Sequence, residues 1–477
     1  MISVVVVIVL VCSATAYLEF AGSPSTSSTQ GPQQTSSSGG MTSTSGRTTS
    51  SSGGTTSNDD NATVSTRVSS AEGNTTNFVL GNSSTVSTVD GNEARKVFQA
   101  LGLTWVFYTD GTNLVYQTIN SSDSLVSSPT VVGPEAIGWH FSVWYDRPSN
   151  TLYYVSTDAQ DIMVPETNQT QGDCQGDYGV SVIATSNSTS GSVTTMTTTS
   201  ATTSTVECTV SGFTYGWGVP TSGGTIGWTV SQDFMQGTGT DATNPYIYGN
   251  GAQVWVSLQT NGGANVEVWK FDGGNSSSWT KVDEVSTPLG SMNEILPLRS
   301  GIALVYAVGG LYLAPRFSEM YVTTTTDGGA TWSTPVSTGD DSSIQNALSV
   351  GNTVYVVGIG NASQVIFWSY TVGASAFTQE QVIASGYSYP FISTDGSSSL
   401  VVSYIDNSSM YVRMSTDLGR SWGPQMLVAT SPGGILPPAV TPFQFEGSTV
   451  PICWLPASGS DTSSYQLQCT SIDVGPA

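Results

Sequence analysis

The sequence predicts an all-β protein made of a repeated unit, and three observations lead to this prediction. Short runs rich in Val, Tyr, Ile and Trp alternate with clusters of Gly, Asn, Ser and Asp, which is typical of short strands joined by turns. No window after residue 20 has the apolar periodicity of an amphipathic helix. A turn-like motif also recurs at a fixed interval in the second half of the chain.

The recurring motif is Ser/Thr-x-Asp-x-Gly-x-Ser/Thr-Trp. It reads TTDGGATW around Asp327 and STDLGRSW around Asp417, so the two aspartates stand 90 residues apart. Half of this interval leads to Val372, where an eroded copy keeps a glycine and has Phe377 in place of the tryptophan. A unit of about 45 residues is the length of one four-stranded blade of a β-propeller.

Weaker copies extend the repeat in both directions. Turn markers fall near residues 120, 158, 272, 327, 372, 417 and 473, and the motif aspartate is kept as Asp158, Asp272 and Asp473. Seven markers predict seven blades. The long step between Asp158 and Asp272 holds an insertion at about 160–240, so six or eight blades stay open.

The end of the sequence predicts how the ring closes. Only four residues follow Asp473, too few for a fourth strand. The outer strand of the last blade is therefore expected from the N-terminal side, within Asn77–Val89, where it removes two free sheet edges. Cys453 and Cys469 lie on the last hairpin of this blade and predict a cross-strand disulfide.

The N-terminal part of the chain predicts export. Residues 1–16 are apolar and end in a small-x-small triplet, which predicts a signal peptide. The alternative is a retained anchor or assembly tail over residues 1–20, so membrane attachment stays open. Residues 17–72 are rich in Ser, Thr and Gly and predict a flexible stalk, followed by the propeller at 73–477.

An extracellular or cell-surface location follows from this organisation. Of the other three cysteines, Cys12 lies within the apolar N-terminal segment, and Cys174 and Cys208 predict a second disulfide. Asn-x-Ser/Thr triplets mark possible glycan sites at Asn61, Asn74, Asn82, Asn120, Asn168, Asn187, Asn275, Asn361 and Asn407.

Composition limits the classes of function. The chain has 11 Lys and Arg against 34 Asp and Glu, a net charge of −23, and no cationic stripe that could neutralise phosphates. Nucleic-acid binding is therefore excluded. His140 is the only histidine, so a His-rich metal site is not expected, and no cofactor is expected either. His140 is a candidate catalytic base.

The two strong motifs resemble the Asp-box, or BNR repeat, which is known in sialidases, in other exo-acting glycosidases and in non-catalytic propellers. The resemblance implies that the aspartate accepts N–H bonds in the turn between the third and fourth strands of a blade, away from the substrate pocket. It implies that the tryptophan packs between neighbouring sheets. The framework residues expected on this basis are Asp158, Asp272, Asp327, Gly329, Trp332, Asp417, Gly419, Trp422 and Asp473.

A sialidase-like site would need an arginine cluster for the substrate carboxylate, a tyrosine activated by a glutamate and an acid/base aspartate. Arg299, expected on an inner strand, is the first candidate, with Glu294 nearby and Arg95 as a further arginine. The Arg-Ile-Pro signature of sialidases is absent. The main hypothesis is therefore a non-catalytic recognition or coat protein at the cell surface with glycan-type ligands. The alternatives are a sialidase-like exo-glycosidase and a surface-filament or surface-layer subunit; the oligomeric state is undetermined.

Overall fold

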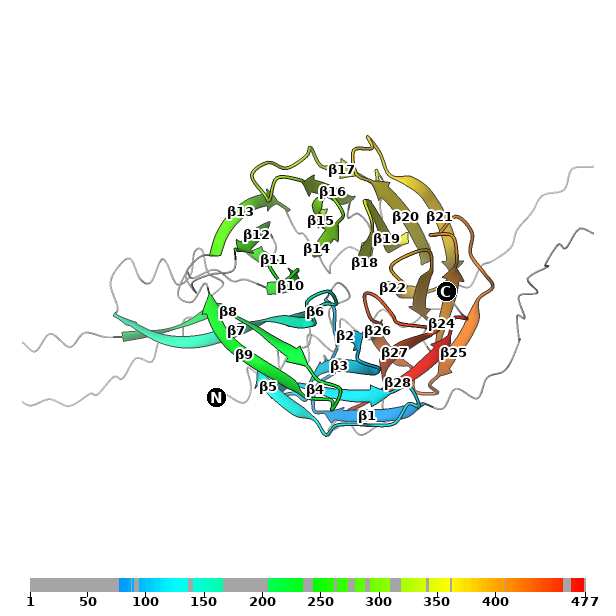
Figure 1. Cartoon of the computed structure of the whole chain (residues 1–477), viewed down its shortest axis with the longest axis horizontal. Helices are drawn as coiled ribbons and strands as arrows, with labels where there is room; N and C mark the ends of the chain where they lie inside the picture. The colour runs from blue at the N-terminus through cyan, green and yellow to red at the C-terminus, as the bar shows by residue number, and fades with distance from the viewer. Residues whose placement is uncertain are drawn as a thin grey trace, which may run out of the picture. The chain divides into compact units, whose positions relative to one another are not determined.

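The computed structural model describes residues 77–86, 88–89, 94–135, 140–165, 205–234, 243–260, 264–272, 279–287, 292–308, 319–339, 343–360, 363–406, 408–457 and 465–475. They belong to one compact unit, Ala71–Ala477. Its described strands form seven four-stranded antiparallel sheets arranged as a seven-bladed β-propeller (Figure 1). The predicted fold class is confirmed.

Blades are numbered here in chain order, and their strands run from the centre of the ring outward. Blade 1 consists of β2 (Val97–Ala100), β3 (Leu103–Thr109), β4 (Asn113–Asn120) and β5 (Thr130–Pro134). Blade 2 consists of β6 (Phe141–Asp146), β7 (Thr151–Pro165), β8 (Thr205–Pro220) and β9 (Ile226–Phe234). Blade 3 consists of β10 (Thr243–Gly249), β11 (Val254–Thr260), β12 (Asn265–Phe271) and β13 (Trp279–Ser286).

The remaining blades follow the same pattern until the last. Blade 4 consists of β14 (Asn293–Leu298), β15 (Gly301–Val308), β16 (Glu319–Thr325) and β17 (Val336–Ser337). Blade 5 consists of β18 (Ser343–Val350), β19 (Thr353–Gly360), β20 (Gln364–Thr371) and β21 (Thr378–Ser385). Blade 6 consists of β22 (Ser388–Thr394), β23 (Leu400–Ile405), β24 (Ser409–Ser415) and β25 (Met426–Thr430). Blade 7 consists of β26 (Ile435–Val440), β27 (Thr449–Pro456), β28 (Tyr465–Asp473) and β1 (Phe78–Ser83).

The middle strands of the blades are buried on both faces. All seven residues of β3 (LTWVFYT) and of β11 (VWVSLQT) are buried, because a neighbouring blade covers each face of the sheet. The outer strand β13 (WTKVDEVS) has no buried residue. Apolar side chains gather in seven clusters, one at each junction between adjacent blades. The ring is therefore held together by inter-blade packing rather than by one central core.

The ring closes as the sequence predicts. Strand β1 pairs antiparallel with β28, from Phe78 opposite Cys469 to Ser83 opposite Tyr465. The expected disulfide is present: Cys453 on β27 lies directly opposite Cys469 on β28, and both cysteines are buried.

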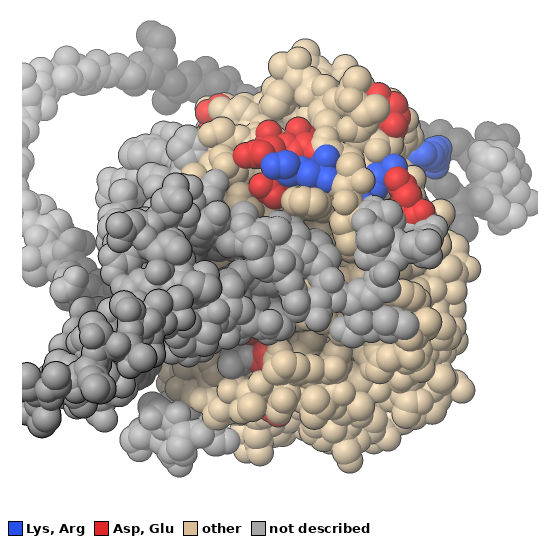
Figure 2. Space-filling model, turned by 90° about the vertical axis from the view of Figure 1, so that its left-hand side faces the viewer, with Lys and Arg blue, Asp and Glu red and all other residues tan. Residues whose placement is uncertain are grey.

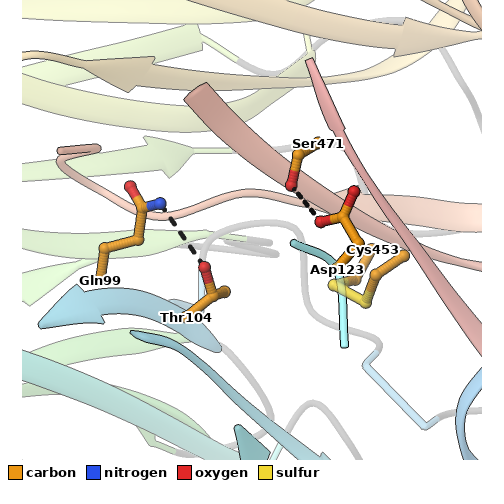
Figure 3. The surroundings of a disulfide bond; sticks show 6 residues. Gln99, Thr104, Asp123, Cys453 and Ser471 are labelled. Atoms are coloured by element: carbon orange, nitrogen blue, oxygen red, sulfur yellow. Dashed lines mark hydrogen bonds between the residues drawn. A yellow bond between two sulfur atoms is a disulfide. The ribbon is translucent and has the colours of Figure 1, made fainter. Parts of the chain in front are cut away.

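A hydrogen bond ties the closing blade to its neighbour. Beside the disulfide, the Ser471 hydroxyl of β28 donates to the Asp123 carboxylate of blade 1 at 2.8 Å (Figure 3). Blade 7 is therefore joined to blade 1 by a side-chain bond in addition to the packing at their junction.

One sequence marker is wrong. Asp158 is not in a turn between third and fourth strands, because it lies inside β7, the second strand of blade 2, opposite Gly212. The turn that joins the third and fourth strands of this blade follows Pro220. The insertion separates β7 from β8 and so moves the third strand far down the sequence, where its turn has no aspartate. The strands β7 and β8 extend past the ends of the other two strands of the blade, and they stay paired with each other as far as Pro165 and Thr205 (Figure 1).

Several predictions fall outside the described residues. Cys174 is one of them, so the second disulfide stays a prediction. The same holds for residues 1–20 and for the sequons at Asn61, Asn74, Asn168, Asn187, Asn275, Asn361 and Asn407. Asn82 is exposed on β1, whereas the side-chain oxygen of Asn120 accepts bonds from the N–H groups of Ser122 and Ser124. In the part of the chain that the structure describes, no helix is long and apolar enough to cross a bilayer.

Candidate functional site

A buried charged cluster lies where the first strands of the blades meet. Arg95 precedes β2 and is 1% exposed. Its Nε donates to the Tyr246 hydroxyl of β10 at 3.0 Å, and its Nη2 lies 3.6 Å from Glu294 Oε2 of β14. Tyr246 and Glu294 are fully buried. The structure thus places an arginine beside a Tyr–Glu pair at the centre of the ring.

The rest of the Arg95 guanidinium is bound to the backbone of other blades. Nη1 donates to the carbonyl oxygen of Ile392 on β22 at 3.2 Å, and Nη2 donates to the carbonyl oxygen of Ala347 on β18. The carbonyl of Arg95 itself accepts from Val143 N on β6. One residue therefore contacts the first strands of blades 2 to 6, which is the arrangement of a structural hub.

The side chains that contact Arg95 have further interactions of their own. Glu294 Oε1 accepts bonds from Asn346 Nδ2 at 3.2 Å and from the N–H of Ala347 at 2.8 Å. Burial raises the pKa of Tyr246, Arg95 lowers it and Glu294 raises it, and the net pKa lies well above the usual tyrosine value. Tyr246 is therefore a neutral phenol at physiological pH rather than an activated nucleophile.

An aromatic side chain covers this cluster. Phe443 comes from the loop between β26 and β27, and its ring lies 5.0 Å from the Arg95 guanidinium carbon and 4.7 Å from the Trp144 ring. It packs against the clusters at three blade junctions. A cavity of about 40 Å³ is lined by Arg95, Trp144 and Phe443. That volume is far below the roughly 300 Å³ at which ligand pockets begin.

The structure places the candidate catalytic residues at different positions in the ring. Arg95 and Glu294 do meet, but the expectation that Arg299 lies on an inner strand is wrong. β14 ends at Leu298, and Arg299 is exposed in the two-residue turn before β15. His140 Nδ1 lies 3.6 Å from Glu135 Oε1 at the start of blade 2. Among the described arginines, only Arg95 touches the Tyr–Glu pair, so these residues form no arginine clamp.

The sequence did not single out Tyr246, Asn346 or Phe443. Tyr246 is one of 20 tyrosines and sits in an ordinary strand pattern. Phe443 belongs to a loop whose path across the centre of the ring depends on contacts with other blades. Nothing in the local sequence signals either role.

A larger depression opens beside this loop, with a volume of about 550 Å³. We call it the Arg147 groove; it is lined by Arg147, Asp395, Ser397, Phe445, Glu446 and Ser448. Arg147 lies in the turn between β6 and β7, donates to the carbonyl of Gln444 at 3.0 Å and lies 3.5 Å from Glu446. The groove thus combines a guanidinium, two carboxylates and two hydroxyls.

The strong motif turns have matching hydrogen bonds. Asp327 Oδ1 accepts from the Thr331 N–H at 2.9 Å, and its Oδ2 accepts from the Thr331 hydroxyl at 2.6 Å. Asp417 makes the same two bonds with Ser421 at the same distances. These bonds lower the pKa of each aspartate to about 2. The turns lie between the third and fourth strands of blades 4 and 6.

The motif glycines and tryptophans pack against the preceding blade. Gly419 has φ +83°, and a Cβ there would lie 2.3 Å from the Phe367 ring of blade 5. Trp422 meets the same ring edge-to-face at 5.2 Å. Gly329 likewise approaches Val282 and Trp255 of blade 3, and Trp332 packs at the junction of blades 3 and 4. The weaker markers Asp272 and Asp473 follow or end the third strands of blades 3 and 7.

Charged side chains in blade 3 form ion pairs with one another. Lys281 lies 3.3 Å from Glu267 and 2.7 Å from Glu284, and Lys270 lies 2.9 Å from Asp272. Figure 2 shows acidic and basic side chains side by side on the described surface of this part of the ring, with mostly uncharged residues around them. Among the described residues, no three His, Cys, Asp or Glu side chains are grouped to hold a metal ion.

Fold and site together define the chain as a seven-bladed β-propeller with a buried charged cluster around Arg95 and an open polar groove. No protein-family model matches it, and no curated protein matches it in sequence. An ulvan lyase of polysaccharide lyase family PL25, solved with -[GlcA(1-4)Rha3S]- bound, is similar in structure with a TM-score of 0.51 and 8% identity, over 83% of this chain and 95% of that one. The BP39L lectin from Burkholderia pseudomallei aligns with a TM-score of 0.49 and 11% identity, over 81% and 98% of the two chains.

Proposed function

We propose that this chain is a non-catalytic recognition or coat protein of the cell surface, displayed on a Ser/Thr-rich stalk, with glycans as its ligands. One observation carries the non-catalytic part. Among the residues that the structure describes, the centre of the ring, where a propeller enzyme of the sialidase type would need a substrate-facing arginine cluster, holds one arginine, Arg95, whose donors go to Tyr246, Ala347 and Ile392.

Other observations support the proposal. The turns at Asp327 and Asp417 resemble Asp-boxes in sequence, and their bonds and packing serve the framework. The ulvan lyase binds a polysaccharide on a fold of this kind, so a propeller of this shape can present a sugar site. The apolar segment at residues 1–16 and the Ser/Thr-rich stretch that follows support export.

A sialidase-like exo-glycosidase is the second candidate, because Tyr246 and Glu294 do lie together beside Arg95. Their burial counts against it, since a nucleophile must reach its substrate. Tyr246 would also have to ionise although burial raises its pKa.

Two measurements on the full chain test the proposal. The first is binding to a glycan array, where we expect selective binding to at least one carbohydrate; an empty array would contradict the glycan part. The second is hydrolysis of a fluorogenic sialoside, where we expect none. Turnover that disappears in Tyr246→Phe would establish the enzyme instead.

A further inference from the structure

We propose that the Arg147 groove is the ligand site of this propeller and that it takes an uncharged sugar ring. The proposal rests on the glycan function above and adds to it a location and a ligand class. It places the site at the end of the ring that carries the turns between first and second strands.

The shape of the groove fits a ligand of this size. Its volume of about 550 Å³ lies within the range of roughly 300 to 1,000 Å³ that is usual for small-molecule sites. The cavity beside Arg95 holds about 40 Å³. Of these two hollows, only the groove can accept a pyranose.

The polar groups of the groove suit hydroxyl groups. The Arg147 side chain is 30% exposed and Glu446 is 38% exposed, so both reach the solvent side of the groove. A guanidinium has five N–H donors, and the Arg147 guanidinium uses one of them for its hydrogen bond to Gln444 O. The Glu446 carboxylate accepts hydrogen bonds from hydroxyls, and the Ser397 and Ser448 hydroxyls can donate and accept. Asp395 shapes the groove instead, because its Oδ1 accepts hydrogen bonds from the N–H groups of Ser397, Ser398 and Ser399.

The charge of the groove selects against acidic sugars. Two carboxylates and one guanidinium line the groove, and the whole chain carries a net charge of −23. Burial raises the pKa of Asp395, but hydrogen bonds from Ser397 and Ser399 lower it by more than burial raises it. The net pKa therefore lies below the usual value. Asp395 is therefore ionised at neutral pH, and a carboxylated or sulfated sugar would meet repulsion.

The groove is held in place before any ligand arrives. Phe445 is 2% exposed and packs at the junction of blades 6 and 7, which fixes the floor. Its N–H donates to Thr394 O at 2.9 Å, and the Glu446 N–H donates to Gln99 Oε1 at 2.7 Å. The loop is thus bonded to blades 6 and 1. Such preorganisation reduces the entropy lost on binding.

The position of the groove separates this site from an enzyme pocket of the sialidase type. In an antiparallel four-stranded blade, the turns between strands one and two and between strands three and four lie at the same end. Arg147 and Asp395 belong to first-to-second turns, and Asp417 belongs to a third-to-fourth turn. The groove therefore opens at the end that carries the Asp-box-like turns, which the resemblance places away from the substrate pocket.

The test uses the full chain and named probes: the methyl glycosides of glucose, galactose, mannose and fucose, with sialyllactose and glucuronate as acidic counterparts. Binding is followed by saturation-transfer NMR and calorimetry. Ser397→Trp fills the groove from an exposed position. Ser375→Trp is the matched control, because Ser375 is exposed in the third-to-fourth turn of blade 5 at the same end of the ring.

We expect at least one neutral glycoside to bind, Ser397→Trp to weaken it by at least about tenfold and Ser375→Trp to leave it unchanged. Arg147→Gln, which keeps a donor but removes the charge, should weaken binding less than Ser397→Trp and gives a second reading if the tryptophan variant does not fold.

Three results would overturn the proposal. A glycan that binds wild type, Ser397→Trp and Arg147→Gln equally well would place the site elsewhere and leave the proposed function standing. Binding of the acidic probes alone would overturn the ligand class. If no glycan bound, on the array or in solution, both the proposed glycan-binding function and the proposed ligand site would be contradicted.

Discussion

The guanidinium of Arg95 and the carboxylate of Glu294 lie 3.6 Å apart, and both side chains are shielded from solvent. Arg95 comes from the segment before blade 1, and Glu294 belongs to the first strand of blade 4. The pair therefore joins parts of the ring that are far apart in sequence and that share no sheet.

This relationship predicts that Arg95→Met destabilises the ring strongly. The substitution leaves Glu294 buried without its cation and removes the bonds to Ala347 O and Ile392 O. Loss of one partner of a buried ion pair costs about 3–5 kcal/mol. Urea unfolding followed by tryptophan fluorescence measures the loss. Arg299→Met is the control, because Arg299 is exposed and should change the free energy of unfolding little. If both substitutions lowered the free energy of unfolding equally, Arg95 would not be a structural hub.

The architecture could be predicted from the sequence because a propeller repeats. Half of the interval between Asp327 and Asp417 set the length of a blade, and the closing strand predicted within Asn77–Val89 is β1, which pairs with β28. The marker at Asp158 failed because the repeat gives no information about where an insertion enters a blade. That insertion separates two paired strands, β7 and β8, which only their tertiary pairing identifies.

The candidate site was less accessible from the sequence. Glu294 was predicted because it lies near Arg299 in the sequence and Arg95 as a further arginine, and no pattern linked the two to each other. The Arg147 groove needs Asp395 and Glu446 from turns of two other blades. Whether these residues come together depends on how the blades pack, which the local periodicity of the sequence does not indicate.

The closing blade predicts sensitivity to reduction. The Cys453–Cys469 bond closes a loop with a sequence separation of 16, for which chain entropy predicts a contribution of about 3 kcal/mol. Unfolding in urea with a reductant should therefore occur at lower denaturant than without it. The double variant Cys453→Ala, Cys469→Ala serves as control and should not respond through this bond. A double variant as stable as the wild type would show that the bond contributes nothing.

The motif aspartates predict a specific dependence on pH. The pKa of Asp417 is about 2 in the folded protein, below the ordinary value of 3.8, because Ser421 donates two hydrogen bonds to the carboxylate. A lowered folded pKa stabilises the protein above the unfolded pKa, and this contribution is lost as pH falls from about 4 to about 2. Asp417→Asn should therefore lower the melting temperature at pH 6, with a difference that narrows in acid.

Asp327→Asn should repeat this behaviour, since Thr331 makes the same bonds to Asp327. A difference between wild type and Asp417→Asn that stays constant from pH 6 to pH 2 would contradict the assignment.

The approach of Gly419 to Phe367 predicts which glycine cannot be replaced. Gly419→Ala introduces a side chain at φ +83°, and its Cβ would lie 2.3 Å from a ring atom of Phe367, which is fully buried. The positive φ costs about 1 kcal/mol and overpacking a further 1–3 kcal/mol. Gly373→Ala is the matched control: Gly373 has φ +87° in the corresponding turn of blade 5, and nothing lies within 4 Å of its Cβ position. The control isolates the backbone cost, so the difference in unfolding free energy between the two variants measures the contact between blades. If both variants lose the same stability, Gly419 is needed only for its turn, and the packing of blade 6 on blade 5 does not depend on it.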